Sequence, residues 1–253
     1  MTDLVIIDAD SILYTVGWVE PSPAKGRASV KASIKKIMED TEADTAMVFV
    51  KGSNNFRFQV DIEYKAHRGI DPDKKKRVDI LYEFAREEYT VCDDAEADDY
   101  CGIYATKATA EGKSVVIAHM DKDLDMLPGY HYNFRKKESY QTSVEESYRF
   151  LMQQLLTGDA ADNIKGIHRL GPVTAKKILD PVPVHLLYPT VINTWKTKQP
   201  EDWQNNFWKC ANCIFIRTDE ADLRPLTMDE LNERFTWSTD LRSLDLPQEA
   251  IQP

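Results

Sequence analysis

The sequence LVIIDAD, at residues 4–10, is a short apolar run that ends in two carboxylates. Such a run is typical of a buried parallel strand, because helices cover both faces of a parallel sheet. Asp8 and Asp10 would then lie at the carboxyl end of the strand, where open α/β sheets bind their ligands. A simpler alternative is that Asp10 and Ser11 only cap a following helix. The stretch predicts an α/β fold with a candidate site at one edge of its sheet.

Two further apolar runs repeat this design. Residues 46–50 (AMVFV) and 115–118 (VVIA) have the length and composition of buried strands, and residues 29–41 carry apolar side chains at helical spacing. Alternating strands and helices favour a mainly parallel central sheet flanked by helices. Alternating acids follow the run at 115–118 and would reach the same sheet edge as Asp8: Asp121, Asp123 and Asp125.

Acidic residues gather at two other places. EADD, at residues 96–99, opens a helical pattern, and Glu96 and Asp99 would share a face because residues three apart on a helix are neighbours. The helix dipole stabilises carboxylates at the start of a helix, but this effect explains one or two acids there better than a cluster of acids. Like charges this close repel one another unless a cation offsets them. The second place is GDAAD, at residues 158–162, which sets two aspartates three apart.

Together these acids predict a metal site. Carboxylate oxygens are hard ligands that suit Mg²⁺ or Mn²⁺. A single acidic pair after a strand is a weak indication of a metal site. Two strands that are each followed by such a pair, together with EADD and GDAAD, are a strong indication. The candidate metal ligands are Asp8, Asp10, Glu96, Asp98, Asp99, Asp121, Asp123, Asp159 and Asp162.

Basic residues concentrate in two segments. Residues 52–77 mix cations with aromatic side chains, which suits phosphate contact and stacking on bases. The alternative is a solvated surface loop, although long loops in compact domains are often functional. Residues 166–177 are Gly-rich and basic and then turn helical, and both glycines and helix starts let a backbone hold a phosphate.

Composition limits the class of protein. The 253 residues are 42% hydrophobic and 29% charged, which is typical of a soluble globular chain. A net charge of −10 disfavours non-specific nucleic-acid binding, but bound divalent ions would neutralise part of it. No apolar run approaches the roughly 18 residues that span a bilayer, and the N-terminus lacks the basic segment of a signal peptide. With four cysteines that indicate no disulfide scaffold, we expect a cytoplasmic protein without membrane contact.

The motifs, in their order, resemble those of the phage and bacterial 5′-nucleases, a family of flap endonucleases and 5′–3′ exonucleases. The matching pieces are IIDAD, FRF with YKAHRG, EADD, MDKD and LTGDAADNIKGIHRLGPVTAKKIL, and they cover residues 4–179. The last piece looks like the family's helix–three-turn–helix, which binds duplex phosphates through backbone amides and often holds a K⁺ ion. Many members carry an aspartate near Val50, where this chain has Val-Lys-Gly, and Asp10 is a candidate to replace it.

The resemblance implies a fold, a division of the chain and roles for single residues. The fold is a PIN-like 5′-nuclease core at residues 1–155 with a basic arch-like loop at about 52–90. A helix–three-turn–helix at 156–180 and a mostly helical region at 181–253 follow. Lys65 and Arg68 would be catalytic residues at the base of the arch, beside Tyr64. The candidate DNA-binding residues are Tyr64, Lys74, Lys75, Lys76, Arg77, Gly166, Ile167, Arg169, Leu170, Gly171, Thr174, Lys176 and Lys177.

The implied function is hydrolysis of DNA phosphodiester bonds at or near 5′ ends and flaps. Two Mg²⁺ or Mn²⁺ ions would activate a water and stabilise the leaving oxygen, which gives 5′-phosphorylated products. The partner would be branched or 5′-ended duplex DNA with a single-stranded 5′ end, in the host cytoplasm if a phage encodes the protein. Two alternatives stay open: a PIN-type ribonuclease, and a non-catalytic structure-specific DNA-binding protein.

Overall fold

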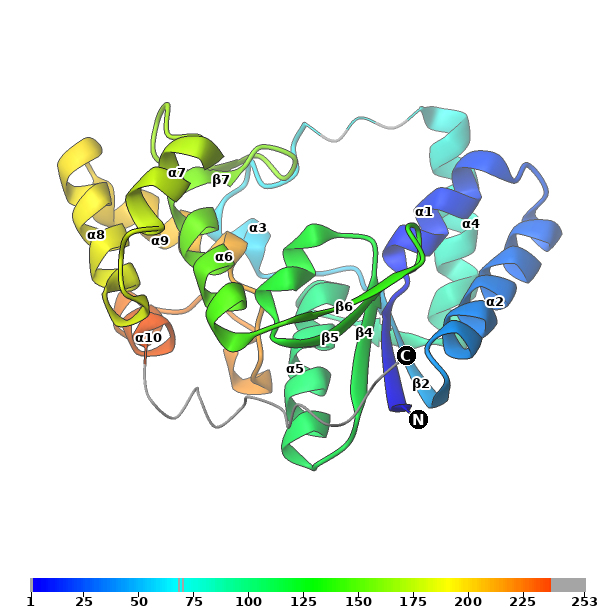
Figure 1. Ribbon diagram of the computed structural model, residues 1–253. Helices are drawn as coiled ribbons and strands as arrows, with labels where there is room; N and C mark the ends of the chain where they lie inside the picture. The colour runs from blue at the N-terminus through cyan, green and yellow to red at the C-terminus, as the bar shows by residue number, and fades with distance from the viewer. Residues whose placement is uncertain (1, 68, 70, 238–253) are drawn as a thin grey trace.

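A six-stranded sheet forms the centre of the protein, with strand order β3-β2-β1-β4-β5-β6 (Figure 1). The computed structural model describes residues 2–67, 69 and 71–237. Five strands are parallel, and only the edge pair of β5 and β6 is antiparallel. The strands are β1 (Thr2–Asp8), β2 (Ala43–Lys51), β3 (Thr90–Cys92), β4 (Val115–His119), β5 (Gly129–Asn133) and β6 (Glu138–Thr142). The prediction of a mainly parallel central sheet is confirmed.

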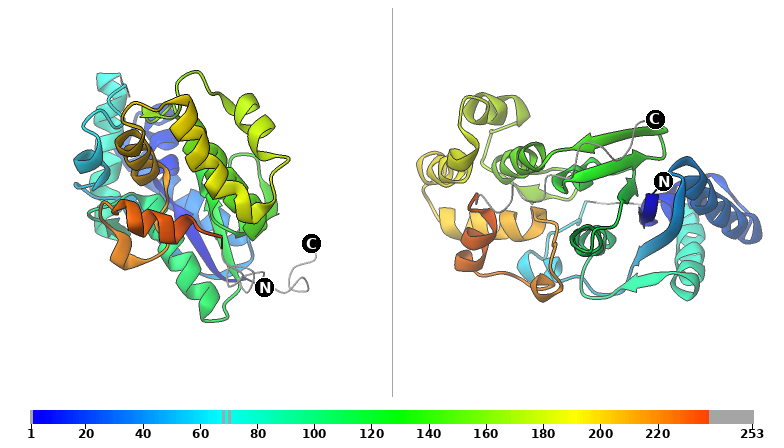
Figure 2. Two further views of the ribbon diagram at one scale, coloured as in Figure 1. Left: turned by 90° about the vertical axis from the view of Figure 1, so that its left-hand side faces the viewer. Right: turned by 60° about the horizontal axis from the view of Figure 1, so that its bottom comes forward.

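The central strand β1 is buried on both faces, as its unbroken apolar sequence predicts. Val5 and Ile7 face one core together with side chains of three helices, α1 (Asp10–Val19), α2 (Pro23–Asp40) and α4 (Pro72–Glu88). Leu4 and Ile6 face a second core that contains α5 (Ala97–Ala110) and the C-terminal helices. Figures 1 and 2 show the blue and cyan helices on one side of the sheet and the yellow to red helices on the other. The sheet is therefore flanked by helices on both faces.

The second half of the chain adds a helical layer to this core. Its helices are α6 (Val144–Thr157), α7 (Pro172–Leu179), α8 (Leu187–Lys198), α9 (Trp203–Ile214) and α10 (Met228–Phe235). Trp195 of α8 is fully buried, and its indole N–H donates to the carbonyl oxygen of Leu155 at 2.9 Å. One continuous core runs from Leu4 of β1 to Phe235 of α10. Residues 181–237 are mostly helical, as expected, and 238–253 lie outside the described residues.

Short elements connect these layers. They are α3 (Arg57–Val60), the 3₁₀ turns η1 (Lys122–Met126), η2 (Val184–Leu186) and η3 (Glu220–Asp222), and the strand pair β7 (Gly158–Asp159) and β8 (Ile164–Lys165). Gly158 has a φ of 64°, and a Cβ atom there would lie 2.2 Å from the carbonyl oxygen of Ile164. Only glycine therefore allows α6 to turn directly into β7. No helix in the described part of the chain is long and apolar enough to cross a membrane.

The basic segment differs from the expected loop over residues 52–90. Helix α4 occupies residues 72–88 of it, because Asp71 caps the helix by accepting from the N–H groups of Asp73 and Lys74 and Pro72 suits the first turn. The apolar side of α4, including Val78 and Leu81, packs against α1 and α2. The candidate residues 74–77 thus lie on the first turns of a packed helix rather than in a loop.

Candidate metal centre

A cleft of about 580 Å³ opens at the carboxyl ends of β1, β2 and β4. Carboxylates that are far apart in the sequence meet in it, because parallel strands deliver their following residues to one sheet edge. Seven of the nine candidate ligands line the cleft: Asp8, Asp10, Glu96, Asp98, Asp121, Asp123 and Asp162. The sheet edge therefore concentrates negative charge at the place that the sequence indicates.

Backbone N–H groups fix the acids that follow β1 and β4. Asp8 accepts from the N–H of Asp10 at 3.0 Å and from the hydroxyl of Ser11 at 2.9 Å. Asp10 in turn accepts from the N–H of Lys51, at 3.1 Å, which joins the ends of β1 and β2. Asp121 caps η1 by accepting from the N–H of Asp123 at 3.0 Å. Each of these carboxylates is thus held in place before any cation arrives.

Burial and crowding disfavour the charged form of these carboxyl groups. Burial, with the nearby charge of Asp10, raises the pKa of Asp8 to about 7. Burial and the charge of Asp8 raise the pKa of Asp98 well above its usual value. Burial and the charge of Asp121 raise the pKa of Asp123 to about 7. A divalent cation in the cleft would reverse these shifts, because it offsets the repulsion that causes them.

Two residues of the basic segment reach into the cleft. The ammonium of Lys65 contacts Glu96 and lies 3.4 Å from Oδ2 of Asp162, and its backbone N–H donates to the carbonyl oxygen of Asp162 at 2.8 Å. The hydroxyl of Tyr64 donates to Glu96 at 2.9 Å. Burial opposes ionisation of Glu96, but Lys65 and Arg57 outweigh it and hold the pKa of Glu96 below its usual value. Lys65 thus lies at the acid cluster, as its catalytic assignment requires.

Tyr64 does not fit its expected role in stacking on DNA. Its side chain is only 3% exposed and lies between Glu96 and Asp162, with the hydroxyl 3.4 Å from Oδ2 of Asp162. The tyrosine therefore supports the carboxylates from within the core. Arg68, its expected catalytic neighbour, lies outside the described residues.

Asp99 points away from the cleft, in contrast to our expectation for a ligand. Its two oxygens bind the guanidinium of Arg57 at 2.5 and 2.9 Å, and it also accepts from the N–H of Arg217 at 2.9 Å. One of these oxygens accepts from the N–H of Glu96 as well, at 3.0 Å, which completes a capping box at the start of α5. Asp99 is thus occupied with positioning Glu96. It lies about 100° around the helix from Asp98 and turns inward, whereas Asp98 and Glu96, which precedes the helix as its N-cap, face the cleft.

Asp159 is not among the residues that line the cleft, but its carboxyl group lies near Asp123 and helps to raise the pKa of Asp123. It also accepts from the N–H of Ala161 at 2.8 Å, which holds the tight turn after β7. Sequence reasoning missed Gln154 of α6, whose amide donates to Asp123 at 2.7 Å. It also missed Arg57, for which the only signal was its place between two phenylalanines in the basic segment.

Comparison with known proteins agrees with this geometry. A family model described as the 5′-3′ exonuclease, N-terminal resolvase-like domain, matches residues 3–149, more than half of the chain. The chain belongs to this 5′–3′ exonuclease family. The resemblance found in the sequence motifs is thereby confirmed.

Two relatives and one solved structure show the extent of the likeness. The DNA polymerase I of Rhizobium leguminosarum is 31% identical over 153 residues, which cover 55% of this chain and 15% of the polymerase. The flap endonuclease Xni of Colwellia psychrerythraea is 31% identical over 164 residues, 60% of this chain and 57% of that protein. The crystal structure of the bacteriophage T5 flap endonuclease, a complex with DNA and metal ions, superposes with a TM-score of 0.62 at 18% identity. The superposition covers 96% of this chain and 98% of that one. The chain thus spans about a seventh of the polymerase and somewhat more than half of the flap endonuclease Xni. It shares the fold of the phage enzyme.

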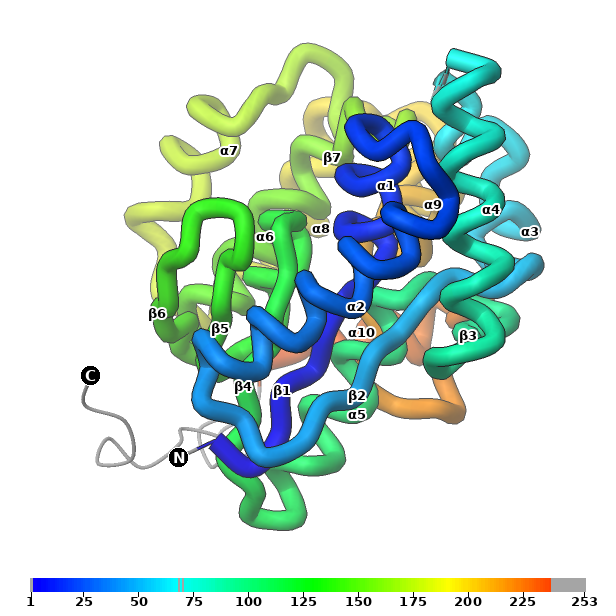
Figure 3. Tube along the Cα trace, turned by 90° about the vertical axis from the view of Figure 1, so that its right-hand side faces the viewer, coloured from blue at the N-terminus to red at the C-terminus, as the bar shows by residue number. Residues whose placement is uncertain are grey.

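Two surfaces of this 5′–3′ exonuclease family member carry the predicted DNA-binding residues outside the cleft. Figures 1 and 3 place α7 and the start of α4 at the same end of the molecule as α1. On α4, Lys76 is exposed, whereas Lys75 pairs with Asp79 at 2.6 Å. Lys74 lies 3.9 Å from the ring centre of Trp18, and Arg77 donates to the carbonyl oxygen of Gly17 at 2.9 Å. The basic block therefore partly holds α4 against α1.

The second surface is the segment at residues 166–177. Ile167 and Leu170 are buried, and their N–H groups donate to the carbonyl oxygens of Leu156 and Ile167, at 2.9 and 3.0 Å. The N–H of Thr174 donates to the carbonyl oxygen of Gly171 at 3.0 Å. These three residues, expected to bind DNA, therefore use their amides within the protein. The other expected residues lie at or near the surface: Gly166, Arg169, Gly171, Lys176 and Lys177.

Proposed function

We propose that this chain is a metal-dependent 5′-nuclease that hydrolyses DNA phosphodiester bonds at or near 5′ ends and flaps. The single observation that carries the proposal is the meeting of seven carboxylates and Lys65 in one cleft. Membership of the 5′–3′ exonuclease family supports the same reaction. The expected products carry a 5′ phosphate, and the expected place of action is the cytoplasm.

The residues present fit hard divalent cations. The acids of the cleft offer only oxygen donors, and their raised pKa values reflect repulsion that a cation would relieve. We propose that Asp8, Asp10, Glu96 and Asp98 hold one Mg²⁺ or Mn²⁺ ion, and that a second set holds another: Asp121, Asp123, Asp159 and Asp162. When bound, such ions would supply a water of lowered pKa and stabilise charge on the leaving oxygen.

The protein's own residues orient this site. Asp99 and Arg57 fix the start of α5 and so position Glu96. The ammonium of Lys65 contacts Glu96 and Asp162. Once cations bind these two carboxylates, the ammonium would contact the scissile phosphate instead. A lysine suits this exchange because its flexible stem carries a compact charge.

DNA is the proposed partner. The T5 flap endonuclease with the same fold is described as a complex with DNA and metal ions. At the start of α7, Gly171 provides no side-chain cap, Pro172 has no N–H and the N–H of Thr174 donates to Gly171, so the N–H of Val173 is the candidate donor to a backbone phosphate. Lys176 and Lys177, in the last turn of α7, would add positive charge, and a K⁺ ion could bridge this segment to the duplex. These contacts would grip the duplex away from the cut.

The proposal is tested by incubating labelled 5′-flap DNA, nicked duplex and single-stranded RNA with the protein, in Mg²⁺ and in EDTA. We expect Mg²⁺-dependent cleavage of the DNA substrates with 5′-phosphorylated products. Asp98→Asn and Asp121→Asn should each nearly abolish cleavage while duplex binding survives, and the exposed control Asp44→Asn should cleave like the wild type.

Other outcomes would favour the alternatives. Cleavage of RNA in preference to DNA would indicate a PIN-type ribonuclease. Binding of flap DNA without turnover in Mg²⁺ or Mn²⁺ would indicate a non-catalytic structure-specific DNA-binding protein. Wild-type turnover by either aspartate variant would overturn the assignment of the cleft.

A further inference from the structure

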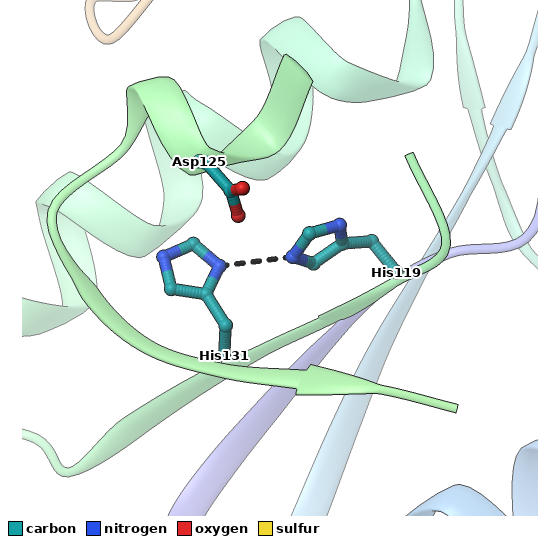
Figure 4. A group of neighbouring side chains, drawn as sticks. All are labelled: His119, Asp125 and His131. Carbon is teal, nitrogen blue, oxygen red and sulfur yellow. Dashed lines mark hydrogen bonds between the residues drawn. The ribbon is translucent and has the colours of Figure 1, made fainter. Parts of the chain in front are cut away.

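His119, Asp125 and His131 form a compact cluster beside the acidic cleft (Figure 4). His119 ends β4, His131 lies in β5, and Asp125 comes from η1, which passes over both rings. One nitrogen of each ring and one carboxylate oxygen all lie within 4.8 Å of one another. The two histidines are at most 1% exposed. None of the three residues is among those that line the cleft, so the proposed nuclease function leaves them unexplained.

The hydrogen bonds of the two rings fix where their protons are. Nδ1 of His119 lies 2.5 Å from the carbonyl oxygen of Asp121, and Nε2 of His131 lies 3.0 Å from the carbonyl oxygen of Leu127. A carbonyl oxygen only accepts, so each of these nitrogens carries the proton of its ring. In neutral imidazoles the remaining nitrogens, Nε2 of His119 and Nδ1 of His131, then both present lone pairs. These two nitrogens face each other at 3.0 Å.

Two facing lone pairs repel, and the neighbouring groups do not resolve the conflict. The hydroxyl of Tyr140 has one proton, and it lies 2.5 Å from Asp125 but 3.3 Å from Nε2 of His119. That proton serves the nearer carboxylate. Both rings are buried, which disfavours a second, charging proton on either of them.

We propose that Nε2 of His119, Nδ1 of His131 and the Asp125 carboxylate bind one transition-metal ion of the Zn²⁺ type. Two imidazoles and one carboxylate form a ligand set that suits Zn²⁺ and differs from the oxygen-only cleft. Metal-binding histidines usually donate their other N–H to a carboxylate or a backbone carbonyl, which orients the ring, and both rings here donate in this way.

The distance between the two imidazole nitrogens requires little movement. Nitrogens about 2.0–2.1 Å from a tetrahedral Zn²⁺ lie about 3.3 Å apart. The observed 3.0 Å therefore needs to widen by only about 0.3 Å. Asp125 and Tyr140 are partly exposed, which gives an ion a path from solvent and leaves room for a water or the Tyr140 hydroxyl as the fourth ligand.

The proposed ion would join β4, η1 and β5 directly behind the cleft. His119 holds the carbonyl oxygen of Asp121, and η1 contains Asp123. The ion would therefore stabilise the turn that carries two of the acids in the cleft, as a structural site with no direct part in phosphodiester hydrolysis.

The test measures Zn²⁺ binding and stability, which do not depend on nuclease activity. The full chain is titrated with Zn²⁺ in a large excess of Mg²⁺, which occupies oxygen-only sites, and bound Zn²⁺ is measured by competition with a chromophoric chelator. We expect one Zn²⁺ ion per chain and a higher Tm in Zn²⁺, because a ligand that binds only the folded state stabilises it. Co²⁺ in place of Zn²⁺ should give the absorption bands of tetrahedral coordination with nitrogen ligands.

Variants assign the ion to these residues. His131→Gln should lose the bound Zn²⁺ and the Tm increase, and Asp125→Asn, which alters a partly exposed residue and spares the fold, should weaken binding by about tenfold or more. The exposed control His185→Gln should bind as the wild type does. Absence of tight Zn²⁺ binding by the wild type would overturn the proposal. Wild-type affinity in folded Asp125→Asn would overturn it equally, and would place the ion in the cleft.

Discussion

The guanidinium of Arg57 binds both oxygens of Asp99, at 2.5 and 2.9 Å, and neither side chain is more than 2% exposed. The pair joins α3 to the start of α5, and Arg57 also donates to the carbonyl oxygens of Cys213 and Phe215. Burial disfavours the charge on Arg57, but Asp99 outweighs it and keeps the pKa of Arg57 above its usual value. The basic segment, the EADD helix and the C-terminal region are therefore locked together beside the cleft.

Removing one partner of this pair should leave a buried, uncompensated charge. We expect Arg57→Met to lower the free energy of unfolding by about 3–5 kcal/mol, as measured by urea denaturation. Asp99→Asn should have a similar effect, since the guanidinium would then lack its carboxylate. Lys75→Ala, which removes an exposed ion pair with Asp79, serves as the control and should change stability by at most about 0.5 kcal/mol. A loss of less than about 1 kcal/mol in Arg57→Met would contradict the structural role.

The sequence was informative where local patterns determine structure. Asp8 and Asp121 could be placed at one edge of the sheet because each follows a buried parallel strand. The role of Asp99 could not be read in this way, since its partners Arg57 and Arg217 are 42 and 118 residues away. Charge alone does not distinguish an arginine that binds DNA from one that satisfies a buried acid.

Tertiary packing also decided two other outcomes. Tyr64 belongs to a basic, aromatic segment, yet the fold buries its ring and directs its hydroxyl to Glu96. The His119–His131 pair depends on the register of β4 against β5, in which Ile117 pairs with His131. A pattern read along one strand does not give the register between two strands.

The raised carboxyl pKa values predict how stability depends on pH without metal. Asp8 and Asp123 have a pKa of about 7 in the folded protein and an ordinary value of 3.8, so in this range only the folded state takes up protons on them. Stability should therefore rise as pH falls through 7. In EDTA we expect the free energy of unfolding to increase by about 1 kcal/mol between pH 8 and pH 6.5. The buried histidines increasingly oppose this gain as the pH approaches 6.5, because the unfolded state protonates them more readily.

Two controls isolate the carboxylates in this experiment. Saturating Mg²⁺ should remove the gain, because the bound cations keep the acids ionised. Asp8→Asn should reduce the gain in EDTA and raise stability at pH 8, since it removes one of the crowded charges. Stability in EDTA that falls between pH 8 and pH 6.5 would show that these carboxyl groups are ionised in the metal-free protein.

Replacement of Lys65 separates transition-state stabilisation from affinity. Lys65→Ala removes the one described lysine that contacts Glu96 and Asp162 in the cleft. We expect kcat on 5′-flap DNA to fall by about 10²–10³-fold, while Kd for the same DNA changes by less than about threefold. Single-turnover cleavage and binding in Ca²⁺ measure the two quantities. If weaker binding accounted for the whole loss, Lys65 would act in affinity rather than in catalysis.

Lys176 tests whether α7 grips the duplex away from the cut. Its side chain is exposed in the last turn of α7, so it should neutralise one backbone phosphate. We expect Lys176→Ala to weaken duplex binding equally on different sequences and to reduce the slope of log K against log salt by about 0.9. Cleavage at saturating DNA should stay within about twofold of the wild type, because no acid of the cleft is altered.

Lys35→Ala, an exposed change on α2, should leave the slope unchanged. An unchanged slope in Lys176→Ala would mean that the duplex does not contact this face of α7, and a proportional loss of kcat would place the helix at the cleavage site.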